Sequence, residues 1–116
     1  MNYNKLSEEE QIELVSEYGP RIQKIKNPSE TVQLAAIREY TYSIQYIKNP
    51  SEAVQLAAVK LNAFMIRYIN DPSDDVKFAA INTNPFVILY IDHPTKEMRD
   101  YAILMQSWHN LASLSE

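Results

Sequence analysis

Residues whose types and spacing could support catalysis or metal binding are few in this sequence of 116 residues. Asp92 and His93 are adjacent, but neighbouring side chains do not converge on one metal ion, and no third ligand is spaced to join them. The chain has no cysteine and one glycine, so it offers neither a thiolate nucleophile nor a glycine-rich phosphate loop. The sequence therefore predicts a protein that is not an enzyme and that uses no metal or cofactor.

The histidines and the acidic residues near the N-terminus are better explained as structural. His93 precedes a proline, in a position that also holds Asn27, Asn49 and Asp71. Asparagine and aspartate accept hydrogen bonds from the free amides of a helix start, so we expect the side chain at this position to cap a helix. His109 follows Trp108 and is expected at or near the surface. Glu8–Glu10 suit the first turn of a helix, where carboxylates offset the helix dipole.

The charge of the chain indicates which classes of partner are disfavoured. The formal net charge is −4. Binding to nucleic acid or to an anionic membrane draws on clustered lysine and arginine. The basic cluster of this chain comprises Arg21, Lys24 and Lys26, with Lys48 one repeat later, and acidic residues flank it. We therefore expect no membrane partner and disfavour nucleic acid. The polar start and the absence of any apolar run of membrane-spanning length predict a cytoplasmic protein.

The elements that position these residues come from an internal repeat. Pro28, Pro50, Pro72 and Pro94 are spaced evenly, 22 residues apart. In the same register Ile22, Ile44, Ile66 and Ile88 align with one another. A short N-terminal tail, 1–5, precedes a single helical-repeat domain, 6–116. Its five units are 6–27, 28–49, 50–71, 72–93 and 94–116.

Each unit reads as two short helices. The first is expected to begin at the Asn, Asp or His before the proline, which places the proline at the first helical position. Glu30, Glu52 and Asp74 would then stand at the third, where a carboxylate can complete a capping box. A break at Asn62 or at Asn84-Pro85 separates the second helix, which in the second unit spans about 42–48, with Ile44 and Ile47 facing inward. In the last unit, 95–114 reads as either one helix or two.

Helices this short are marginal alone, so neighbouring units must bury one another's apolar faces. The predicted fold is all-α: an α-solenoid, a right-handed superhelix of five 22-residue two-helix repeats. Residues 71–91, DPSDDVKFAAINTNPFVILYI, resemble a leucine-rich variant repeat, a HEAT-like helical repeat. The matching residues are Asp71, Pro72, Val76, Lys77, Ala79, Asn84, Pro85, Ile88 and Ile91.

The NPSE-x-VQLAAV wording of 27–37 and 49–59 is also similar to repeats in many uncharacterised bacterial and phage proteins. This resemblance implies an accessory protein of a phage or mobile element. Such a protein would bind and modulate, as an inhibitor, a host protein such as a defence nuclease.

Two aromatic positions recur in successive units. The first holds Tyr42, Phe64, Phe86 and Trp108, and the second, four residues later, holds Tyr46, Tyr68 and Tyr90. Either both fill the space between layers, or the first packs while the tyrosines form an exposed ridge for a partner. Another position holds Gln33, Gln55 and Lys77, which either bond to loops or contact the partner.

Three functional hypotheses follow. The first is a non-catalytic protein–protein interaction module that uses the second tyrosine position and the Gln/Lys position. The second is binding of single-stranded nucleic acid by tyrosine stacking. The third is a self-associating structural protein, a homodimer formed through the C-terminal unit by Met98, Tyr101, Met105 and Trp108. The sequence leaves open the identity of the partner, the exposed aromatic position, the oligomeric state and the curvature of the stack.

Overall fold

In the computed structural model, helices joined by loops make up the described part of the chain. This part comprises residues 1–114, without the side chains of His109 and of 112–114. Within it no strand occurs, which confirms the all-α prediction. The α-helices are α1 (Glu8–Glu17), α2 (Glu30–Glu39), α3 (Glu52–Leu61), α4 (Asp74–Thr83) and α5 (Lys96–Leu114). The 3₁₀ helices are η1 (Tyr3–Lys5), η2 (Gly19–Lys24), η3 (Thr41–Tyr46), η4 (Ala63–Tyr68) and η5 (Pro85–Tyr90).

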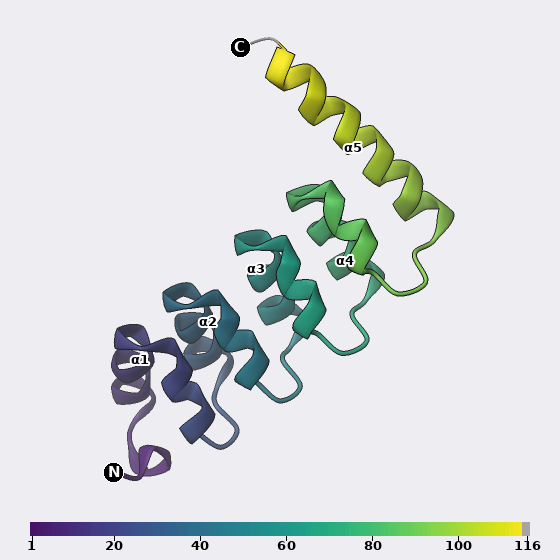
Figure 1. Ribbon diagram of the computed structural model, residues 1–116. Helices are drawn as coiled ribbons and strands as arrows, with labels where there is room; N and C mark the ends of the chain where they lie inside the picture. Colours follow the sequence, from purple (N-terminus) through teal and green to yellow (C-terminus); the bar gives the residue numbers. More distant parts are fainter. Residues whose placement is uncertain (115–116) are drawn as a thin grey trace.

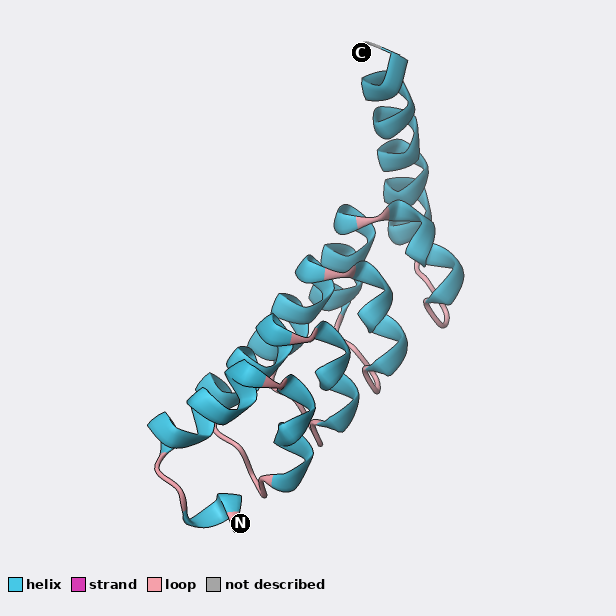
Figure 2. Ribbon diagram, turned by 60° about the vertical axis from the view of Figure 1, so that its left-hand side comes forward, coloured by secondary structure: helices cyan, strands magenta, loops and turns pink. Residues whose placement is uncertain are grey.

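The elements are arranged in two rows that follow the order of the chain. Figure 1 shows α1–α5 succeeding one another from the N-terminus to the C-terminus, with the termini at opposite ends. In Figure 2 the 3₁₀ helices form a second row beside the α-helices, and loops connect the two rows. Each α-helix packs on the next α-helix, and η2 to η5 pack on one another in the same way. The result is an elongated molecule of 52 × 34 × 16 Å.

The α-helices begin two residues later than the sequence analysis expects. The N-caps of α2, α3 and α4 are serines, not the residues before the prolines, and in α5 the amide of Met98 donates to Thr95. Ser29, Ser51 and Ser73 accept hydrogen bonds from the amides of Val32, Val54 and Val76, each at 3.3 Å. Glu30 therefore stands at the first helical position and not at the third, as do Glu52 and Asp74. Of the described helices, α1 has a capping box, because Glu10 lies three residues after Ser7.

The residues before the prolines have a different role. Asn27, Asn49, Asp71 and His93 adopt left-handed backbone conformations, with φ between 47° and 53°. The prediction that His93 caps a helix is therefore wrong. Asn, Asp and His are the non-glycine residues that tolerate this region best, which explains why one of these three types stands at this position in each unit. The left-handed residue turns the chain from one unit into the next.

The second element of each two-helix unit is a 3₁₀ helix of six residues. The predicted breaks at Asn62 and Asn84 are confirmed, since each residue ends an α-helix in an extended conformation. Their side chains then accept hydrogen bonds from the amides of Phe64 and Phe86 and so start the 3₁₀ helices. Ile44, on this element, is buried as expected.

The core runs along the whole row between the α-helices and the 3₁₀ helices. α2, α3 and α4 contribute residues at the same three repeat positions, which in α2 are Val32, Ala36 and Ile37, all fully buried. At the first junction the chain approaches so closely that a Cβ on Gly19 would lie 2.5 Å from the carbonyl oxygen of Ala36. The Gly19 amide donates to the Glu39 carboxylate at 3.0 Å and thereby ties the first unit to the second.

The last unit departs from the expected two-helix repeat. Residues 96–114 form one continuous helix, α5, and no second helix follows it in the described chain. Figures 1 and 2 both show the second half of α5 extending beyond α4. None of the helices in the described range has the length and apolar character needed to cross a membrane.

Candidate binding groove

Three hollows lie in succession beside the loops that connect the units. Each combines a tyrosine at the end of a 3₁₀ helix with a Gln or Lys from the α-helix before it. The pairs are Gln33 with Tyr46, Gln55 with Tyr68, and Lys77 with Tyr90. The structure therefore brings the six candidate partner-binding residues together, one pair per unit.

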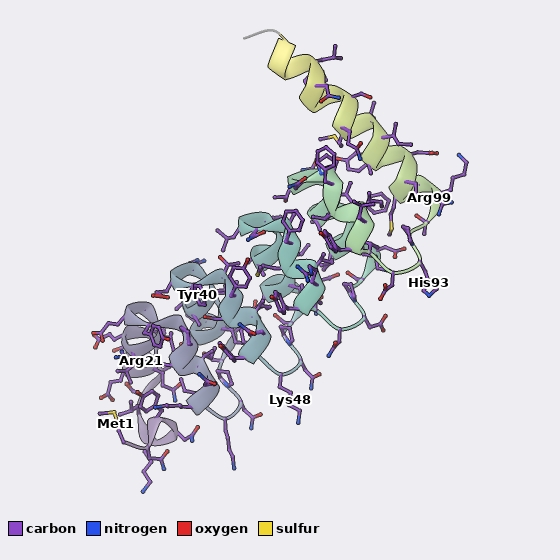
Figure 3. The ribbon with its side chains drawn as sticks, viewed as in Figure 1. Met1, Arg21, Tyr40, Lys48, His93 and Arg99 are labelled. Atoms are coloured by element: carbon purple, nitrogen blue, oxygen red, sulfur yellow. The ribbon has the colours of Figure 1, made fainter. Side chains whose placement is uncertain are left out.

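The hollows form one surface because they share lining residues. Tyr46, Lys48 and Asn49 line both the first and the second, and Asn70 lines both the second and the third. We term this continuous surface the loop groove. Figure 3 shows Lys48 and His93 projecting from the loops along the same edge of the molecule. The loop residues were not among the sequence-based candidates, although their place beside the repeating prolines is a signal that could have found them.

Residues at both aromatic positions are exposed to solvent, so the structure differs in part from each of the two alternatives predicted from the sequence. Tyr46, Tyr68 and Tyr90 are 39%, 40% and 47% exposed. At the first position Phe64 is partly buried, whereas Phe86 is 56% exposed. The tyrosines thus form a solvent-facing ridge as the second alternative proposes, but the first aromatic position does not pack uniformly.

The first aromatic position holds the groove tyrosines of the following unit in place. The ring of Tyr42 meets that of Tyr68 edge to face, with centroids 5.9 Å apart. Phe64 meets Tyr90 in the same way at 5.6 Å. The guanidinium of Arg67 also lies 5.1 Å from the centre of the Tyr90 ring. Because edge-to-face geometry is the arrangement that aromatic pairs prefer, these contacts favour one orientation of the Tyr68 and Tyr90 rings.

The glutamines are partly committed to the loops. Gln33 and Gln55 each donate an amide hydrogen to the carbonyl oxygen of Pro28 and Pro50, respectively, at 2.9 Å. The loop-bonding interpretation is therefore correct for the Nε2 atoms. The Oε1 atom of Gln33 is buried and has no hydrogen-bond partner among the described residues. Lys77 replaces the amide with a cation in the third hollow.

The charges along the groove change from one end to the other. Lys26 and Lys48 line the first hollow, whereas in the third Arg67 and Lys77 are balanced by Asp71 and Asp92. The remaining basic residues of the N-terminal cluster are engaged elsewhere. Arg21 donates to the carboxylate of Glu17 at 2.9 Å, and this hydrogen bond raises the pKa of the Arg21 guanidinium. The ammonium of Lys24 lies 5.6 Å from the centre of the Tyr3 ring.

The residues expected to support self-association do not form one exposed face. Met98 is fully buried. Tyr101 packs against the Phe78 ring, with centroids 5.9 Å apart, and its hydroxyl donates to Asn82 at 2.6 Å. Both residues thus lie where α5 packs on α4. Met105 is half-buried, and only Trp108 of this set is largely exposed, at 66%.

No protein-family model, curated protein or solved structure matches this chain. The resemblance to leucine-rich variant repeats stays a prediction from the sequence.

Proposed function

We propose that this protein is an α-solenoid that serves as a non-catalytic protein-interaction module, whose loop groove binds an extended segment of a partner protein. The packing of each unit on the next supports the solenoid, and its right-handed superhelix is part of the same proposal. The observation that carries the binding role is the recurrence of one tyrosine and one Gln or Lys in each of three connected hollows. Tyrosine offers a large contact area at a low entropy cost, which suits it to recognition surfaces.

The repeat spacing matches an extended peptide. Packed helices lie roughly 8–10 Å apart, so successive hollows recur at about that interval. Three residues of an extended polyproline-type chain advance about 9 Å. One unit of the groove therefore accommodates three residues of the bound segment, and every third side chain would meet a tyrosine. Such a chain has free backbone amides and carbonyls, which suit the asparagine and glutamine side chains of the groove.

The charge at the first hollow adds a preference. Lys26 and Lys48 lie there without the acidic neighbours that accompany Arg67 and Lys77 in the third hollow. An acidic residue at the corresponding end of the bound segment would gain a complementary charge. The resemblance to phage and mobile-element repeats extends the proposal to the partner, a host protein that this module binds and modulates.

Tyr46 provides the sharpest test of the loop groove. It lines two hollows, and among the described residues it has no aromatic partner, so its removal leaves the packing of other rings intact. Peptides selected from a random library on the immobilised protein should bind Tyr46→Ser at least roughly tenfold more weakly in calorimetric titration, a loss of about 1.4 kcal/mol. Tyr18 is 57% exposed and lies outside the groove. The matched control Tyr18→Ser should bind as the unchanged protein does.

Two results would contradict the proposal. Equal losses for Tyr46→Ser and Tyr18→Ser would place the binding surface outside the groove. Recovery of single-stranded oligonucleotides, with an affinity that falls steeply as salt rises, would favour the tyrosine-stacking alternative. A protein segment bound by these tyrosines should show a much weaker dependence on salt.

A further inference from the structure

The end of the molecule formed by η5 and α5 exposes apolar residues at positions that the preceding units bury or fill with polar side chains. The clearest case is Ile103. Its equivalents Val15, Ile37, Val59 and Ile81 are all fully buried. Ile103 is 63% exposed, because the described part of the last unit has no 3₁₀ helix to cover it.

The 3₁₀ row ends in the same way. Phe64 and Arg67 both contact Tyr90 of the following unit, so these two repeat positions face the next unit. At η5 the same positions hold Phe86 and Leu89. They are 56% and 81% exposed.

Two further positions change from polar to apolar only at this end. The position of Leu104 holds Arg38, Lys60 and Asn82 in the preceding units, and that of Leu111 holds Gln45 and Arg67 before Leu89. Leu104 and Leu111 are 63% and 61% exposed, and Trp108 lies one helical turn from each. Phe86, Leu89, Ile103, Leu104, Trp108 and Leu111 are termed the C-terminal face. Substitution of polar by apolar residues at exposed positions marks a surface that another molecule covers.

We propose that the C-terminal face is a dimer interface and that its occupant is the same face of a second copy of this chain. Aromatic side chains bury roughly 150–250 Å² each and leucine somewhat less, so six residues at these exposures present on the order of 600 Å². A standard interface buries roughly 800 Å² per partner, which the surrounding polar atoms can complete. Residues 101–114 contain no Asp, Glu, Lys or Arg, so two copies of the helix can approach without repulsion between like charges.

The opposite end of the molecule is unsuited to cover this face. There η1 packs over the first unit: Gln11 donates to the carbonyl oxygen of Tyr3 at 2.9 Å, and the Lys26 amide donates to Asn4 at 2.7 Å. α1 adds the exposed carboxylates of Glu9 and Glu13, which would lose their hydration against an apolar surface. A head-to-tail contact would also generate open filaments, whereas pairing of identical faces closes at two copies.

Sedimentation velocity of the full chain, from micromolar to submillimolar concentration, tests the dimer. We expect a monomer–dimer equilibrium that Leu104→Lys weakens by roughly 30-fold or more, as loss of a central apolar contact does. Lysine should be tolerated by the fold, since Arg38 and Lys60 occupy this repeat position, and circular dichroism checks that helix content is kept. Leu111→Lys, whose position holds Arg67 in the third unit, repeats the test. Leu61→Lys is the matched control, because Leu61 is similarly exposed, at 54%, and lies on α3.

Three outcomes would overturn the dimer. They are a strict monomer at every concentration, species that grow beyond two copies, and a dimer that Leu61→Lys weakens as much as Leu104→Lys does. A strict monomer would assign the C-terminal face to a different protein. None of these outcomes bears on peptide binding in the loop groove, which Tyr46 tests separately.

Discussion

At the scale of single residues, the close contact between the first two units depends on the side chain that Gly19 lacks. Its backbone φ is not positive, so the glycine is required by space and not by conformation. A Cβ there would approach both the Ala36 carbonyl oxygen and the Ser43 hydroxyl to 2.5 Å. The hydroxyl could rotate away, but the carbonyl belongs to the backbone of α2 and moves only with the helix.

Gly19→Ala is therefore expected to lower the free energy of unfolding by about 1–3 kcal/mol, the usual cost of overpacking a tight junction. Urea denaturation followed by circular dichroism measures the loss. The equivalent position in the third unit is already alanine, Ala63, which is buried without difficulty. An unchanged midpoint for Gly19→Ala would mean that the first junction can open enough to admit a methyl group.

At the scale of the elements, α2, α3 and α4 each begin after a serine that follows the repeat proline. The serine hydroxyl accepts from the amide three residues on, so it satisfies one of the free donors at the helix start. The left-handed residue and the proline precede this serine in the loop, and both line the loop groove.

Ser51→Ala should cost about 1 kcal/mol of stability, because the amide of Val54 loses its acceptor. Ser51→Asn should restore most of this loss, since asparagine is an equally good N-cap. The comparison of the two variants in urea denaturation separates capping from any other effect of the serine. Equal stability of Ser51→Ala and the unchanged protein would contradict the assignment of the cap.

At the scale of the whole molecule, each unit contacts its immediate neighbours along an elongated row. In such an arrangement stability is close to a sum of unit and interface contributions, and the central units have neighbours on both sides. Opening of a terminal unit breaks one interface, whereas opening of a central unit breaks two. The second half of α5 extends beyond its neighbour (Figure 1).

Hydrogen exchange followed by mass spectrometry should accordingly show a gradient of protection. We expect amides of α2 and α3 to exchange slowest and those of the second half of α5 to exchange fastest at low protein concentration. Uniform exchange across α1–α5 would show that the row unfolds as one cooperative unit and would contradict this expectation.

The sequence alone was sufficient for the helical class, the 22-residue period and the breaks at Asn62 and Asn84, because these depend on local chain chemistry and on the recurrence of residue types. Within each unit it misplaced the helix start. Asn, Asp and Ser are all good N-caps, but Asn49 has a positive φ, whereas Ser51 has the extended conformation of an N-cap. The recurrence of residue types in the sequence identified the six candidate partner-binding residues. Their pairing in the groove could not be predicted from the sequence, because it depends on how each α-helix packs on the following 3₁₀ helix.

Exposure was decided only in the tertiary structure. Phe64 and Phe86 occupy the same repeat position, yet one is partly buried and the other is 56% exposed, because only the first has a following tyrosine to cover it. The same reason places Ile81 in the core and leaves Ile103 exposed. A residue type and a repeat position describe what a side chain can contact, but burial depends on whether another unit is present to make that contact.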